Sequence, residues 1–135
     1  MVLLLAGCGK EAGRVPFSAP GKQSASVQLA AGDVAFWTDI DIKLDGPATL
    51  TYGIELKQGG SSVAKASCDP LGDMNVKIGW IETTFGESRS RRGSGKMSCS
   101  ATLAKGGLTE VDAELAFGSK PTTFTLRKAD LVLKQ

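Results

Sequence analysis

The chain has 135 residues, of which 41% are hydrophobic, 22% charged and 6% aromatic, and this length suits one domain. A net charge of +2 is too near neutral for a dedicated nucleic-acid binder. The apolar content is too high for a disordered chain, and no apolar run approaches the ~20 residues that span a bilayer as a helix. The sequence has no histidine, which excludes the Ser-His-Asp triad and most catalytic zinc sites.

The N-terminus carries a short apolar run, residues 2–5, followed by small residues and a cysteine. Its Leu5-Ala6-Gly7-Cys8 resembles the lipobox of bacterial lipoproteins, where a peptidase cuts after small side chains and a thiol accepts lipid. The resemblance implies an exported protein with a diacylglycerol-modified cysteine. A complete signal peptide has a basic region and 7–15 apolar residues, so we expect either a start codon further upstream or a shortened chain. The alternative is a frayed terminus with a chance cysteine.

The lipobox resemblance also implies a domain organisation. Gly9 is not the aspartate associated with inner-membrane retention, which favours the outer membrane, facing the periplasm or the cell surface. Residues 1–7 are then a signal-peptide remnant. Residues 8–23 are expected to form the lipidated cysteine and a flexible tether, within which residues 15–17 are a candidate edge strand. The folded domain is expected at residues 24–135.

Two cysteines remain once Cys8 is assigned to a lipid anchor. An even pair in an exported domain favours a disulfide between Cys68 and Cys99. Such a bond closes a loop of about thirty residues and is expected to add roughly 3–4 kcal/mol of stability. The alternative is a pair of buried free thiols.

Alternation of apolar and polar residues predicts strands along the rest of the chain, beginning with residues 24–29. The clearest run is 33–44, with its even positions facing the core. A turn at 45–47 joins it to the run 48–57, and the two together predict a long antiparallel hairpin. Later strands are predicted at 62–68, 75–82, 96–103, 109–117 and 122–134, the last with a bulge near Arg127-Lys128.

About eight strands with turn signals between them, and no sustained helical stripe, predict the fold class. We expect an all-β protein, an antiparallel β-sandwich of Greek-key or jelly-roll type. In the strand 75–82, Val76, Ile78 and Trp80 are predicted to face the core.

Trp37 shares the outward positions of the strand 33–44 with Asp33, Asp39 and Asp41. An aromatic ring beside carboxylates is how many sandwich lectins hold sugars, so a carbohydrate site is one hypothesis. The alternative is that the tether or a neighbouring loop, such as the one with Phe17, covers the ring.

The same aspartates, with Asp45, raise the hypothesis of a structural calcium site, since calcium takes several oxygen ligands. Alternate residues along a flat strand diverge, and the sequence has no D-x-D-x-D-G loop. We therefore expect no metal and no cofactor other than the covalent lipid.

Residues 85–96 are rich in glycine and serine and carry four cations: Arg89, Arg91, Arg92 and Lys96. This pattern predicts a mobile basic loop that engages lipid phosphates, an anionic surface polymer or an acidic partner. The alternative is a solvated hairpin loop whose polar residues only maintain solubility.

Serine, lysine and aspartate are plentiful, but their spacing predicts no set of nucleophile, base and orienting group. We therefore predict a non-enzymatic, membrane-tethered lipoprotein of the envelope or cell surface. Its expected partner is an envelope protein or polysaccharide rather than nucleic acid. One alternative is a carbohydrate-binding module that uses Trp37 and the neighbouring aspartates. Another alternative is a hydrolase of unknown type.

Overall fold

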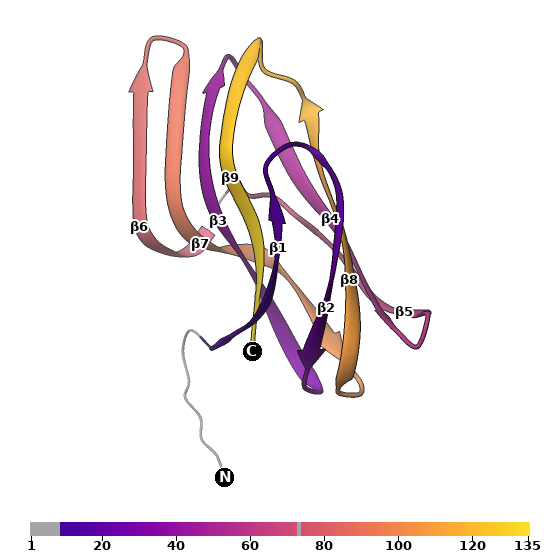
Figure 1. Ribbon diagram of the computed structural model, residues 1–135. Helices are drawn as coiled ribbons and strands as arrows, with labels where there is room; N and C mark the ends of the chain where they lie inside the picture. Colours follow the sequence, from indigo (N-terminus) through magenta and orange to yellow (C-terminus); the bar gives the residue numbers. More distant parts are fainter. Residues whose placement is uncertain (1–8, 73) are drawn as a thin grey trace.

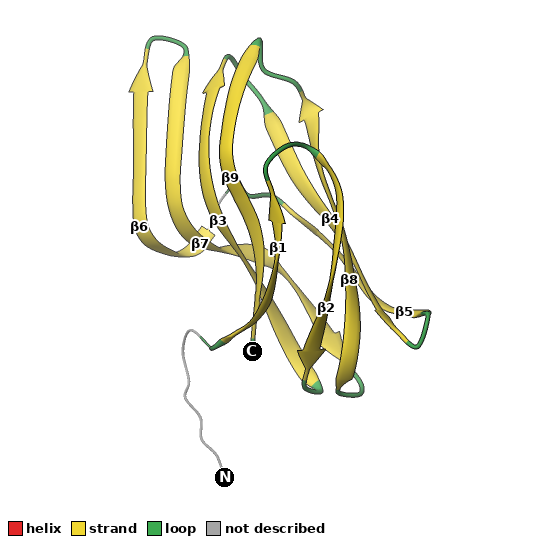
Figure 2. Ribbon diagram, viewed as in Figure 1, coloured by secondary structure: helices red, strands yellow, loops and turns green. Residues whose placement is uncertain are grey.

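The computed structural model describes residues 9–72 and 74–135, and every element in these ranges is a strand (Figures 1 and 2). Nine antiparallel strands form two sheets, which confirms the predicted β-sandwich. The strands are β1 (Glu11–Phe17), β2 (Gly21–Leu29), β3 (Gly32–Asp45), β4 (Thr49–Gln58), β5 (Ser61–Cys68), β6 (Met74–Phe85), β7 (Ser88–Leu103), β8 (Gly107–Ser119) and β9 (Thr123–Lys134).

The two sheets differ by one strand. The larger sheet has the order β1-β9-β3-β7-β6, and the smaller has the order β2-β8-β4-β5. β1 contacts β2 at one side of the sandwich, and β5 contacts β7 at the other. The strand β6 lies beyond β7 and packs chiefly against it, so the four-stranded sheet leaves β6 largely uncovered (Figure 1).

The core between the sheets follows the predicted alternation of β3. The even positions of β3 from Val34 to Leu44 are buried, and the buried Thr38 and Tyr52 hydroxyls meet across the layers at 2.9 Å. Burial raises the pKa of Tyr52, since the charged phenolate is disfavoured away from water. Apolar side chains on the inner faces of the two sheets pack together as one core.

The predicted hairpin of residues 33–44 with 48–57 is wrong. β3 pairs with β7 and β9, whereas β4 pairs with β5 and β8 in the other sheet. The connection at Gly46, with φ of 91°, carries the chain from one sheet to the other. Alternation identifies both strands correctly, but two strands that face each other across a core have the same pattern as two that pair side by side.

The expectation of a flexible tether over residues 8–23 is also wrong for its described part. β1 pairs with β9, and β2 begins at Gly21, so the folded domain begins near residue 10 rather than residue 24. Within β1, Val15 and Phe17 are buried, which confirms the candidate edge strand at residues 15–17. Cys8 and the signal-peptide remnant lie outside the described residues.

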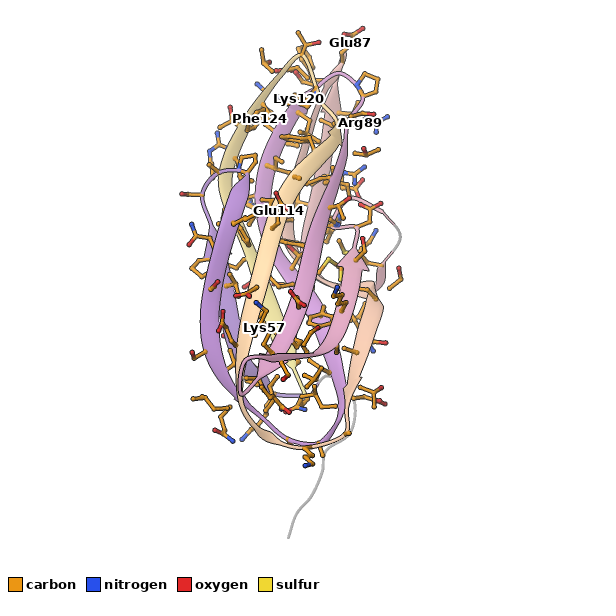
Figure 3. All side chains as sticks on the ribbon, turned by 90° about the vertical axis from the view of Figure 1, so that its right-hand side faces the viewer. Lys57, Glu87, Arg89, Glu114, Lys120 and Phe124 are labelled. Carbon is orange, nitrogen blue, oxygen red and sulfur yellow. A yellow bond between two sulfur atoms is a disulfide. The ribbon has the colours of Figure 1, made fainter. Side chains whose placement is uncertain are left out.

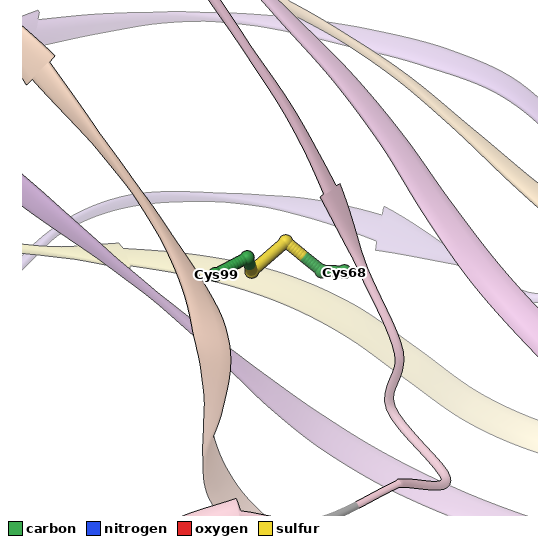
Figure 4. The surroundings of a disulfide bond; sticks show 2 residues. All are labelled: Cys68 and Cys99. Atoms are coloured by element: carbon green, nitrogen blue, oxygen red, sulfur yellow. A yellow bond between two sulfur atoms is a disulfide. The ribbon is translucent and has the colours of Figure 1, made fainter.

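Two finer predictions are confirmed. A disulfide joins Cys68 at the end of β5 to Cys99 of β7, and so links the two sheets (Figure 4). The Cα atoms of the two cysteines are 5.4 Å apart. In β9, Arg127 is the extra residue of a bulge, because the pairing with β3 passes directly from Lys128 to Leu126.

Candidate functional site

The outstanding surface feature is the outer edge of β6, a strand of 12 residues. Among the described strands, β7 is its one hydrogen-bonded neighbour. An edge strand presents unpaired backbone donors and acceptors that a further strand can complete. In Figure 1, β6 and its turn to β7 stand at the left margin of the molecule, clear of the four-stranded sheet.

The outward face of β6 carries a stripe of apolar side chains. Val76, Ile78 and Ile81 are 37%, 50% and 51% exposed, and Phe85 at the end of the strand is 85% exposed. Apolar side chains gathered in this way mark contact surfaces more often than isolated ones do. Their partners on β7 are polar: Lys96 opposite Val76, Ser94 opposite Ile78, Arg92 opposite Ile81 and Ser88 opposite Phe85.

The opposite face of β6 holds a cluster of Lys77, Trp80 and Glu82. The Trp80 indole nitrogen donates to Glu82 Oε1 at 2.8 Å, and Lys77 Nζ lies 3.9 Å from the same oxygen. Lys77 Nζ is also 5.6 Å from the centroid of the Trp80 ring. The hydrogen bond from Trp80 is the main cause that lowers the pKa of Glu82, so this face presents one stable carboxylate and one ammonium.

A β-bulge at Gly79 and Trp80 divides β6 in two. The pairing with β7 passes from Ile78 to Ile81, so that two residues of β6 oppose Gly93 alone. Gly79 has a φ of 60°, and a Cβ on Gly93 would lie 2.7 Å from the Gly79 carbonyl oxygen, so both positions favour glycine. The bulge switches the alternation, and outward side chains have even numbers before it and odd numbers after it.

The prediction that Val76 and Ile78 face the core is wrong, whereas Trp80 does pack against the core. A regular strand would place all three residues on one face, but the bulge separates Trp80 from the other two. The sequence signal for this bulge is Gly79, a glycine inside a strand pattern. The apolar edge itself is a site that the sequence pattern alone does not identify.

Trp37 lies on the outer face of β3, but its ring is not exposed. The residue is 1% exposed, and the Lys134 ammonium lies 3.9 Å from the ring centroid. Lys134 of β9 therefore lies over the ring, whereas Phe17 is buried in the core between the sheets. This burial counts against the carbohydrate hypothesis, which requires an accessible ring for stacking.

The three aspartates that accompany Trp37 do not converge on one point, and each binds other groups of the chain. Asp39 lies at the centre of this outer face, whereas Asp33 and Asp41 lie further along β3 in opposite directions. Their hydrogen-bond partners are Thr102 for Asp33, Arg14 and Ser94 for Asp39, and Arg127 for Asp41.

Arg14 of β1 connects three carboxylates on the same face. One guanidinium nitrogen donates to Asp39 at 3.0 Å and to Asp130 at 2.8 Å, and the other nitrogens donate to Glu11 at 2.7 Å. The hydrogen bonds between Arg14 and Glu11 raise the pKa of Arg14 and lower the pKa of Glu11. This region of the sheet is therefore a structural ion-pair network.

The expected basic loop at residues 85–96 is wrong, because nearly all of the segment belongs to the β6–β7 hairpin. The alternation of β7 divides the four cations between its faces. Arg91 faces inward with Arg89 and donates to a backbone carbonyl of the β5–β6 connection. Arg92 and Lys96 have the outward parity. The cations therefore do not form one anion-binding patch.

A hollow of about 660 Å³ lies on the outer face of the four-stranded sheet. Figure 3 looks onto this sheet, with Glu114 of the lining and the nearby Lys57 labelled. Its floor includes Gly53, and its walls carry charges of both signs. Here the pKa of Asp112 is lowered to about 2, chiefly by a hydrogen bond from Ser24. Asp112 also forms an ion pair with Lys57 at 2.9 Å, so its charge is already balanced.

A second hollow, of about 710 Å³, lies at one end of the sandwich beside β8 and β9. The rings of Phe117 and Phe124 meet edge to face, with centroids 4.9 Å apart, and Lys120 also lines the hollow. Figure 3 shows Phe124 and Lys120 near this end of the molecule.

Within the described residues, no group of three or more Asp, Glu, Cys or His side chains is arranged to hold a metal ion. The same part of the chain contains no helix that is long and apolar enough to cross a membrane. No protein-family model, curated protein or solved structure matches the chain. Of the features described above, the edge of β6 is the one that combines an unpaired strand edge with a stripe of exposed apolar side chains.

Proposed function

We propose that this protein is a non-enzymatic lipoprotein of the bacterial envelope or cell surface that binds a partner protein along β6. The observation that carries the proposal is the uncovered 12-residue edge with its stripe of four exposed apolar side chains. A strand added to such an edge gains backbone hydrogen bonds, while the apolar stripe provides buried area and selectivity.

The membrane attachment rests on the lipobox-like Leu5-Ala6-Gly7-Cys8, with Gly9 favouring the outer membrane. The disulfide supports export, since disulfides persist in oxidising compartments. β1 begins at Glu11, three positions after the proposed lipid anchor, so the domain would lie close to the membrane. The turn from β6 to β7 lies at the opposite end of the sandwich from the start of β1, which would direct Phe85 away from the membrane (Figure 1).

The test uses cells that produce the chain with its own upstream genomic sequence. A photo-crosslinking phenylalanine derivative replaces Ile81 on β6 or, as a matched control, Ser26, which is exposed on β2. We expect a light-dependent adduct from position 81 and none from position 26, and we expect Cys8→Ser to release the protein from the membrane fraction. Equal labelling at both positions, or none at position 81, would contradict binding along β6.

A further inference from the structure

We propose that the strand which completes β6 is the β6 of a second copy of this chain, paired antiparallel about a two-fold axis at the Gly79–Trp80 bulge. The inference rests on the proposed use of β6 as the binding edge, and it names the partner. A two-fold interface is self-complementary, so the same strand must fit itself in faces, charges and apolar side chains.

The bulge limits which strands can fit. Side chains directly opposite each other in an antiparallel pair lie on the same face of the sheet. Because β6 switches its alternation at Gly79–Trp80, a regular strand matches the faces of both halves only where two residues of β6 oppose one of its own, as they oppose Gly93 of β7. A second β6 carries the same switch, and it matches both halves when the two bulges lie opposite each other.

The charges of β6 favour the same alignment. With the bulges opposite each other, Lys77 faces the partner's Glu82, and by symmetry Glu82 faces the partner's Lys77. A pairing centred on Lys77 would instead oppose two lysines, and one centred on Glu82 would oppose two glutamates. Like charges directly opposite each other destabilise a sheet, and unlike charges stabilise it.

Both charged groups are accessible for this pairing. The Lys77 and Glu82 side chains are 44% and 45% exposed, and their contact within one chain is long, at 3.9 Å. That contact and the hydrogen bond from Trp80 both use Oε1 of Glu82. The partner's ammonium would therefore approach a carboxylate whose charge the surrounding chain already stabilises.

The apolar stripe matches in the same register. Ile78 would lie opposite the partner's Ile81, and Ile81 opposite the partner's Ile78, on the outward face. Val76 would lie opposite Thr83 of the partner subunit, so branched side chains meet across the interface. The uncovered position of β6 lets the two five-stranded sheets join as one continuous sheet (Figure 1).

The test measures the oligomeric state of the full chain carrying Cys8→Ser, which removes the proposed site of lipid attachment, by sedimentation equilibrium. We expect a dimer of twice the 14.0 kDa chain mass. Lys77→Glu or Glu82→Lys alone should weaken the dimer about tenfold or more, because each creates two like-charge pairs. The combined swap Lys77→Glu with Glu82→Lys should restore it. Lys43→Glu, on the exposed outer face of β3, is the matched control and should change nothing.

Register is tested by mixing two single variants, Ile78→Cys and Ile81→Cys, under mild oxidation. The proposed alignment predicts a disulfide between the two variants that forms faster than either variant bonds with itself. A monomer at every concentration, or a dimer indifferent to the charge swaps, would overturn the inference. If position 81 then still crosslinks a protein of another mass in cells, binding along β6 stands; if it crosslinks nothing, the proposed function fails as well.

Discussion

β5 and β6 are the last strands of their sheets on the same side of the sandwich, yet their surfaces differ. β5 has 8 residues, mostly serine and alanine, with Lys65 near its centre and Val63 as its one large aliphatic side chain. β6 has 12 residues and exposes Val76, Ile78, Ile81 and Phe85. Short length, small polar residues and lysine discourage further pairing. β5 therefore has the properties of a strand that ends a sheet, and β6 those of a strand that a partner extends.

The disulfide connects the two regions, since it joins the end of β5 to the strand beside β6. Replacing both Cys68 and Cys99 by alanine should lower the free energy of unfolding by about 3–4 kcal/mol, because the unfolded chain regains the freedom of a loop of about thirty residues. Urea denaturation measures the change. A reductant should weaken the unmodified chain to the same extent and leave the double variant unaffected; a loss below about 1 kcal/mol would contradict this account.

The outer face of β3 provides a second comparison with β6, because its large aromatic residue is covered. Lys134→Gln should remove the cation above Trp37 and lower the free energy of unfolding by about 1 kcal/mol. It should also shift Trp37 fluorescence to longer wavelength, which is measured in a Trp80→Phe background. Lys128→Gln on the same strand is the control. If the two substitutions have equal effects, Lys134 does not cover the ring.

A matched pair of substitutions separates stability from association. Ile78→Thr with Ile81→Thr on β6, and Val63→Thr on β5, keep β-branched side chains in exposed strands. Each should change the free energy of unfolding of dilute protein by no more than about 0.5 kcal/mol. Sedimentation should show that the β6 variant no longer associates and that the β5 variant behaves as the unmodified chain does. Loss of association in both variants would remove the distinction between the two edges.

The strands of the core could be predicted because a buried face imposes a strict alternation, as in β3. The bulge at Arg127 and the Cys68–Cys99 bond were also accessible, one from a change of phase and the other from an even pair of cysteines. The pairing partners of the strands could not be predicted from the sequence, because β3 and β4 have the same pattern whether they lie side by side or face each other.

The edges of the five-stranded sheet were the hardest part to predict. β1 is short and contains Pro16, so its alternation is weak. Residues 88–94 of β7 are not buried, and β6 packs chiefly against β7 rather than against the smaller sheet, so few of their side chains must be apolar. The sequence of 85–96 therefore has the composition of a loop although it forms strand. The candidate site escaped prediction for a different reason, since its exposed apolar residues have the pattern of a core strand.

The smallest expected effect concerns Asp112 of β8, in the four-stranded sheet that has β5 as an edge strand. Its pKa of about 2 depends first on the hydrogen bond from Ser24, so Ser24→Ala should raise it. The pKa of Asp112 is lower in the folded chain than its value of about 3.8 in the unfolded chain, so the charged carboxylate stabilises the fold at pH values above about 4. This contribution is lost as the pH falls from about 4 to 2. An NMR titration of the carboxyl group measures the shift. Ser26→Ala should leave the pKa of Asp112 unchanged; an equal shift in both variants would contradict this assignment.

The central claim is that β6, unlike β5, is an edge that the β6 of a second copy of the chain completes. The most direct measurement is hydrogen exchange of the backbone amides of both strands, at protein concentrations far below and far above the dissociation constant of the dimer. We predict that exchange in β6 slows as the concentration rises, because its free amides gain hydrogen-bond acceptors, while exchange in β5 stays constant. Exchange in β6 that is independent of concentration, or equal slowing in both strands, would contradict the claim.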